Sequence, residues 1–120
     1  MDLTDSYHEM CEMAPEVQSK WTPQPGDYYR AEGSSLTAFL VDPARLSTPA
    51  VWLPRQDQLQ RLLGIQSQRE FLVACHTFGS HPRWFEKAES PEQAWLMLVM
   101  REAYGKVWRG LFWAEISARS

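Results

Sequence analysis

The chain has 120 residues, of which 44% are hydrophobic and 22% are charged, and its formal net charge at pH 7 is -3. This length and composition predict a single globular domain with one hydrophobic core, and they exclude a disordered or repetitive chain. The weakly acidic balance argues against a dedicated nucleic-acid-binding protein, because such proteins neutralise phosphates with Lys and Arg.

The cellular compartment is predicted from the cysteines and from the apolar runs. Two cysteines, Cys11 and Cys75, do not make a disulfide framework, and the polar, acidic start is unlike a secretory signal. The longest apolar run, from 94 to 100, is too short to cross a membrane. We therefore expect a cytoplasmic protein without membrane association.

Apolar residues recur at helical spacing near the start of the chain. Pro15 interrupts this pattern, because proline inside a helix removes a hydrogen bond and clashes with the preceding turn. The pattern predicts either two short helices, over 6–13 and 15–20, or one kinked helix. Ser6 and Glu9 are spaced as a capping box. The apolar positions are Tyr7, Met10, Cys11, Ala14, Val17 and Trp21.

The next part of the chain has the pattern of short strands. Pro25-Gly26 has the residues of a type II turn. Segments 28–31 and 36–41 are strand candidates, and the loop between them predicts an antiparallel hairpin. A third strand is predicted over 50–53, because prolines bound it on both sides.

Two further helices are predicted after these strands. Segment 55–63 has leucines on one face and ends at Gly64. Segment 67–78 favours a helix, with a strand over 71–75 as the alternative, because short apolar runs are ambiguous. The polar loop that follows, 79–89, carries Trp84 and Phe85.

Segment 90–113 is predicted to be the centre of the fold. A helix over 91–104 is apolar on all faces between 94 and 100, so it must be buried. Ser90 and Gln93 form a capping box, and Gly105 suits a left-handed C-terminal cap. Two short aromatic-rich runs then flank Arg109-Gly110, which predicts a small hairpin.

These elements together predict an α+β fold in a single domain over 1–120. A small antiparallel sheet is expected from 28–31, 36–41, 50–53 and the terminal hairpin. Three or four helices should pack against it, with the 91–104 helix in the middle.

Cysteine and histidine offer only a weak case for a metal or for catalysis. His8 and Cys11, and Cys75 and His76, are zinc-ligand types, but neither pair has the usual spacing. Cys75 as a nucleophile would need a base and an electropositive surrounding. Both cysteines instead lie on apolar helical faces, where a free cysteine acts as a small hydrophobic residue. We therefore expect reduced, buried cysteines and no metal, cofactor or catalytic residue.

The start of the 55–63 helix could in principle hold an anion on its free N–H groups, with Arg55 nearby. No glycine-rich loop precedes it, which argues against a nucleotide site. Asp57 is better explained as a charge that complements the helix dipole.

Aromatic and basic residues near the C-terminus could form a weak nucleic-acid surface. Aromatic faces stack on bases while cations follow the phosphates. The same aromatic residues fit a core-facing strand equally well. The residues concerned are Arg101, Tyr104, Lys106, Trp108, Arg109 and Trp113.

The number of aromatic residues predicts a binding surface. Six tryptophans, four tyrosines and five phenylalanines are more than a core of this size easily encloses. Trp84, Phe85, Trp108 and Trp113 are therefore expected to stay partly exposed. Aromatic residues next to arginine are typical of interface anchors. The predicted partner-binding residues are Arg83, Trp84, Phe85, Trp108, Arg109 and Trp113.

Three segments give the chain a family resemblance. They are residues 14–27, residues 52–60, and residues 90–95 with 104–108. In this order they resemble small uncharacterised proteins encoded in phages and prophages, chiefly of Gram-positive bacteria. The resemblance implies no assigned activity and brings no functional residues.

The function expected from the sequence is binding without catalysis. The leading hypothesis is a phage or prophage accessory protein that binds a protein partner or itself. The alternative is a nucleic-acid-binding accessory factor, and a small enzyme of unknown reaction comes third.

Overall fold

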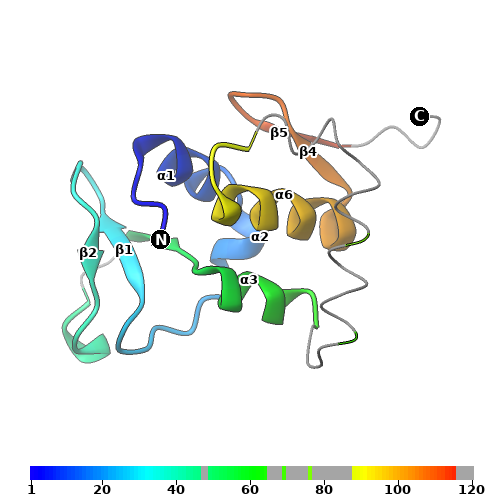
Figure 1. Ribbon diagram of the computed structural model, residues 1–120. Coiled ribbons are helices and arrows are strands. Elements are labelled where there is room, and N and C mark those ends of the chain that lie inside the picture. Colours follow the sequence, from blue (N-terminus) through cyan, green and yellow to red (C-terminus); the bar gives the residue numbers. More distant parts are fainter. Residues whose placement is uncertain (47–48, 65–68, 70–75, 77–87, 116–120) are drawn as a thin grey trace.

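The computed structural model describes residues 1–46, 49–64, 69, 76 and 88–115. It confirms the α+β class (Figure 1). In chain order its elements are α1 (Asp5–Glu12), α2 (Pro15–Gln18), β1 (Tyr28–Ala31), β2 (Ala38–Phe39), the 3-10 turn η1 (Pro43–Arg45), β3 (Ala50–Leu53), α3 (Gln56–Leu62), α6 (Pro91–Tyr104), β4 (Lys106–Trp108) and β5 (Trp113–Glu115).

Helix α6 is the centre of the fold, as its composition predicts. Every residue from Glu92 to Met100 is buried, and α1, α3 and β4 all pack against the helix. The Ser90 hydroxyl accepts a hydrogen bond from the Gln93 N–H at 3.1 Å, which confirms the predicted cap. Gly105 ends the helix with a φ of 64°, a left-handed conformation that glycine adopts without strain.

The N-terminal pattern folds as two helices, with Pro15 at the start of the second. Proline is tolerated there because the first N–H groups of a helix have no intrahelical partner. The predicted capping residue is wrong by two positions. Thr4, and not Ser6, caps α1 by accepting from the Tyr7 N–H at 3.2 Å. Helix α3 and its end at Leu63 and Gly64 agree with the prediction for 55–63.

The main sheet has three antiparallel strands in the order β2-β1-β3. Tyr28 in β1 stands between Phe39 of β2 and Leu53 of β3. Strand β2 is shorter than the predicted 36–41. The Ser34 N–H donates to the Ala31 carbonyl at 3.0 Å and so closes a turn after β1. This turn directs the chain away from β1 before the pairing between β1 and β2 begins.

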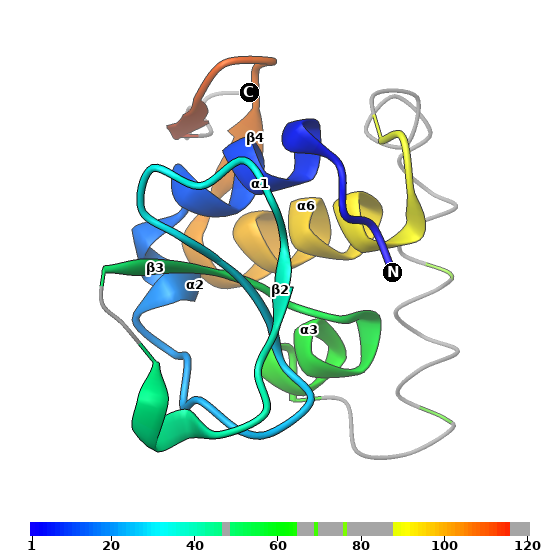
Figure 2. The ribbon, with the colours of Figure 1, turned by 90° about the vertical axis from the view of Figure 1, so that its left-hand side faces the viewer.

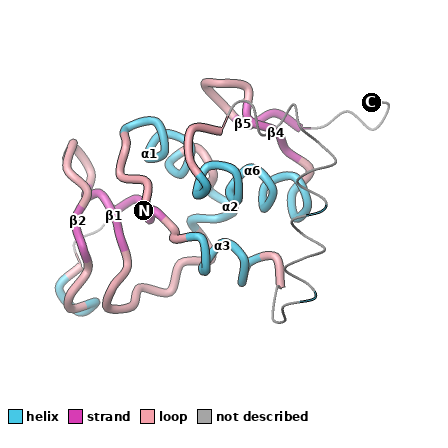
Figure 3. Tube along the Cα trace, in the orientation of Figure 1, coloured by secondary structure: helices cyan, strands magenta, loops and turns pink. Residues whose placement is uncertain are grey.

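The terminal hairpin forms a second sheet, so its predicted membership of the main sheet is wrong (Figure 3). Strands β4 and β5 pair with each other over Lys106–Trp108 and Trp113–Glu115. They pack beside α6, and the outer edge of β3 is occupied by the side chain of Gln18. The hairpin therefore has no free strand edge to join there.

No helix in the described part of the chain is long and apolar enough to cross a membrane. The element predicted over 67–78 lies outside the described residues except for Arg69 and His76. Most of the predicted loop 79–89 lies outside them as well.

Candidate protein-binding site

The predicted partner-binding residues come from two segments, and the structure describes one of them. Arg83, Trp84 and Phe85 lie outside the described residues. Trp108, Arg109 and Trp113 belong to the β4–β5 hairpin, at the opposite end of the molecule from β2 (Figure 1).

The two hairpin tryptophans form the inner side of this small sheet. Trp108 and Trp113 are opposite each other in the ladder, with ring centroids 5.1 Å apart. The Trp113 indole N–H donates to the Met10 carbonyl at 3.0 Å. The prediction that Trp113 stays exposed is wrong, since only 9% of it is accessible. The indole closes the core over α1, and Trp108 is half-buried beside it.

The tip of the hairpin is where apolar surface is exposed. Arg109 donates its N–H to the Phe112 carbonyl at 2.9 Å, which leaves Gly110-Leu111 as a two-residue turn. Gly110 has a φ of 97°, which suits the primed turns that close such hairpins. Leu111 is 72% exposed and Phe112 is 50% exposed.

Leu111 and Phe112 are functional candidates that sequence reasoning did not select. Neighbouring residues on a strand point to opposite faces. Once Trp113 faces the core, Phe112 must therefore face outward. Gly110 marks a hairpin turn in the sequence. Which residues beside the turn face outward could be inferred only once the buried face of the hairpin was known.

The cations around the hairpin are only partly available to an external partner. Lys106 forms an ion pair with Glu16 of α2, and this hydrogen bond raises the pKa of Lys106. Burial alone would raise the pKa of Glu16, but the hydrogen bond and charge of Lys106 together with a main-chain hydrogen bond outweigh burial, and the pKa is lowered. Arg109 is exposed at the tip. With Lys106 paired and Trp113 buried, the geometry gives little support to a base-stacking surface.

Cys11 is buried and free, as predicted, and Cys75 lies outside the described residues. Burial raises the pKa of the Cys11 thiol well above its ordinary value. A thiol in this state is a poor nucleophile, because the thiolate is the reactive form. His8 is half-buried, and its Nε2 lies 3.8 Å from a carboxylate oxygen of Glu12.

The start of α3 is engaged in internal contacts. Arg55 donates to the Gly26 carbonyl at 2.8 Å and pairs with Asp57 at 3.1 Å. The Asp57 hydrogen bond raises the pKa of Arg55. Burial alone would raise the pKa of Asp57, but Arg55 holds it below its usual value. Arg55 therefore links the start of α3 to the residues that precede β1. An anion site at this helix would need the Arg55 guanidinium to be free of such internal contacts.

Two buried carboxylates also serve the fold. Asp27 accepts from the Trp21 indole at 2.8 Å, the Gln24 N–H at 2.9 Å and the Gln58 amide at 2.7 Å. Asp2 accepts from Thr4, Ser90 and Gln93, which ties the N-terminal segment to the start of α6. Each carboxylate has its acceptor positions filled by neighbouring donors, so neither is placed to exchange a proton with a substrate.

Within the residues that the structure describes, no three His, Cys, Asp or Glu side chains are grouped as metal ligands. The chain matches no family model, no curated protein and no solved structure.

Proposed function

We propose that the chain is a non-enzymatic accessory protein that binds a protein partner through the tip of its β4–β5 hairpin. The observation that carries this proposal is the exposure of Leu111 and Phe112 beside Arg109. Exposed aromatic and aliphatic side chains next to arginine have the composition of interface hot spots.

The hairpin supports the tip as a rigid unit. Its base is held by the Trp113 hydrogen bond to Met10 and by the Lys106 ion pair with Glu16. Rigid presentation reduces the entropy lost on binding, so a small apolar tip can contribute more of its contact energy.

The absence of catalysis is proposed from the chemistry of the described side chains. Asp2 and Asp27 are saturated by hydrogen-bond donors, and Cys11 is buried with a raised pKa. An active site would instead need titratable groups that converge on accessible space. The phage or prophage origin rests on the three resembling segments, and the cytoplasmic location rests on composition.

Site-specific photo-crosslinking tests the proposal. Phe112 is replaced by photo-reactive benzoylphenylalanine, and the protein is irradiated in its host cells. The matched control carries the same group at Glu102, an exposed position in the last part of α6. We expect a defined protein adduct from position 112 that is absent from position 102.

The double variant Leu111→Ser, Phe112→Ser supplies the second arm of this experiment. It should compete poorly with the wild-type protein for formation of the adduct, while Glu102→Ala should compete as well as the wild type. Adducts to nucleic acid alone would contradict the proposal, and so would identical adducts from both positions.

A further inference from the structure

The two outer edges of the three-stranded sheet are treated differently. At the β3 edge, the Gln18 carboxamide accepts from the Trp52 N–H and donates to the Trp52 carbonyl, both at 2.8 Å. Pro49 and Pro54 flank this strand and have no N–H to offer. The β3 edge is thus closed by a side chain that imitates a neighbouring strand.

The β2 edge has no such cover. Leu40 directs its N–H to the Asp27 carbonyl and its carbonyl to the Gly26 N–H, at 2.7 and 2.8 Å. Because main-chain groups alternate along a strand, those of Phe39 point away from β1. Among the described residues, no hydrogen bond reaches these outward groups of Phe39.

The side chains along this edge are apolar and exposed. Phe39 is 55% exposed, and Val41 on the same face is 76% exposed. Leu36 is 77% exposed. The Phe39 ring meets Tyr28 edge-on, with centroids 5.4 Å apart, and its other side is open. Residues 34–41 include no charge and no proline, which are two of several features by which edge strands avoid pairing.

From this contrast we propose that β2 pairs antiparallel with the β2 strand of a second copy of this chain, forming a symmetric dimer with one continuous six-stranded sheet. The twofold axis passes beside Phe39, so that Phe39 exchanges main-chain hydrogen bonds with Phe39 of the other copy. Thr37 then lies opposite Val41 of the other copy.

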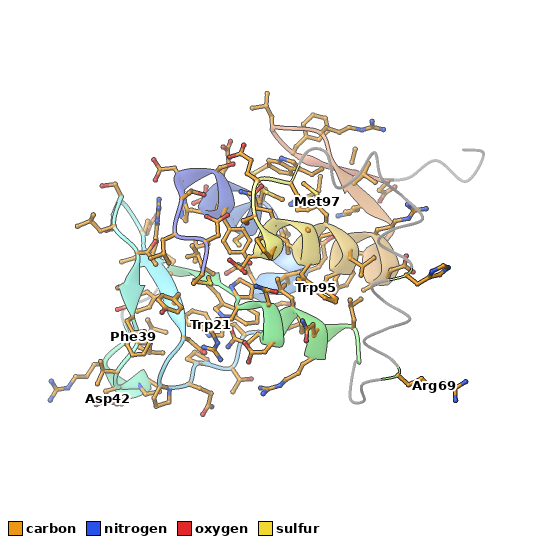
Figure 4. The ribbon with its side chains drawn as sticks, viewed as in Figure 1. Trp21, Phe39, Asp42, Arg69, Trp95 and Met97 are labelled. Atoms are coloured by element: carbon orange, nitrogen blue, oxygen red, sulfur yellow. The ribbon has the colours of Figure 1, made fainter. Side chains whose placement is uncertain are left out.

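A second copy suits this edge because the strand is complementary to itself. In this register, antiparallel self-pairing sets residues 37–41 of one copy against residues 37–41 of the other, all of them uncharged, so no like charges face each other there. The pairing also joins two aromatic residues across the axis, and such cross-strand pairs stabilise sheets. In Figure 2 the β2 strand faces the viewer, and Figure 4 shows Phe39 at this end of the molecule, away from Trp95 in the core.

The proposal is independent of the hairpin tip, and the test separates the two surfaces. Sedimentation velocity is measured over a concentration series for the wild type, Phe39→Lys, Val41→Lys and the matched control Leu111→Lys. We expect a reversible dimer for the wild type and the control, and monomers for the two β2 variants. Far-UV circular dichroism verifies that every variant is folded.

Register is tested by oxidation in a Cys75→Ser background. Residues opposite each other in hydrogen-bonded antiparallel pairs are about 5.5 Å apart at Cα, which a disulfide can bridge. Phe39→Cys should therefore form a disulfide-linked dimer, and Leu36→Cys, which the proposed register sets opposite Asp42, should form far less. A monomeric wild type at all concentrations, or a dimer that is lost only in Leu111→Lys, would overturn the proposal.

Discussion

The side chain of Asp2 shows how one residue can join distant parts of this chain. Its carboxylate accepts from Thr4 beside α1 and from Ser90 and Gln93 at the start of α6. Asp27 does the same for the 21–27 segment and α3 through Trp21 and Gln58. Buried carboxylates are stable only when such donors replace the water that they lose.

Asp2 makes stability dependent on acidity. Burial alone would raise its pKa, but the hydrogen bonds from Ser90, Thr4 and Gln93 outweigh burial and lower the pKa. A carboxyl group whose pKa is lower in the folded than in the unfolded state stabilises the fold at pH values above its unfolded-state pKa, about 3.9. This contribution is lost as the pH falls through the folded-state pKa. Asp2→Asn should thus lower the free energy of unfolding at pH 7. The difference in this free energy between the variant and the wild type should shrink below about pH 4.

Urea unfolding at a series of pH values measures this effect. Asp42→Asn is the matched control, because Asp42 is exposed and caps the 3-10 turn by accepting from the Ala44 N–H, a bond that the asparagine side-chain oxygen also accepts. If the free energies of unfolding of the wild type and Asp2→Asn differ by the same amount from pH 7 to pH 3, the proposed role of Asp2 is contradicted.

Trp95 belongs to the core side of α6, where it is buried among the central cluster. Trp95→Ala should lower the free energy of unfolding by about 3–5 kcal/mol, because it removes a large apolar side chain and leaves a cavity. Leu111→Ala at the exposed tip should change it by less than about 0.5 kcal/mol. Urea denaturation followed by circular dichroism compares the two, and equal midpoints would refute the assignment.

Cys11 should be chemically silent in the folded protein. In a Cys75→Ser background, a thiol reagent should not label Cys11 under native conditions, because the thiol is fully buried and its pKa is raised. Labelling should become complete in denaturant. Rapid native labelling would mean that α1 opens readily or that the thiol is accessible.

At the scale of elements, the side chain of Gln18 decides where the main sheet ends. It joins α2 to β3 by two hydrogen bonds with the main chain of Trp52. The Trp52 ring also stacks on Trp21, with centroids 6.1 Å apart. An edge that is closed in this way directs any further strand pairing to β2.

Gln18→Ala should therefore destabilise the protein by about 1–3 kcal/mol, since it leaves two partly buried main-chain groups without partners. Hydrogen exchange at the Trp52 amide should accelerate more than exchange at β1 amides. Gln56→Ala, at an exposed position of α3, serves as the control for a lost glutamine on a helix. Unchanged exchange at Trp52 would show that water replaces the carboxamide without cost.

At the scale of the whole molecule, α6 connects the two sheets. It packs against α1 and α3 on the side of the main sheet and against β4 of the hairpin. We predict that urea unfolding monitored by tryptophan fluorescence and by circular dichroism gives coincident transitions, because the buried hydrophobic residues that the structure describes form one cluster that includes α6. Earlier loss of one signal would show that the hairpin unfolds independently.

The pattern of residues was sufficient to predict the described helices α1, α2, α3 and α6, the ends of α3 and α6, and the two hairpins. Proline at 15 and 91, glycine at 64 and 105, and the apolar run of α6 act through local backbone sterics and through burial of an all-apolar helix, which do not depend on distant neighbours. The α+β class follows from the order of these elements.

The tertiary structure alone decided which residues form the surfaces. Trp113 is buried because the Met10 carbonyl is present to accept its indole N–H, and Phe112 is exposed as a consequence. The hairpin forms a sheet of its own, and Gln18, far away in sequence, occupies the β3 edge of the main sheet. Such outcomes depend on long-range contacts, which local propensity and periodicity do not encode.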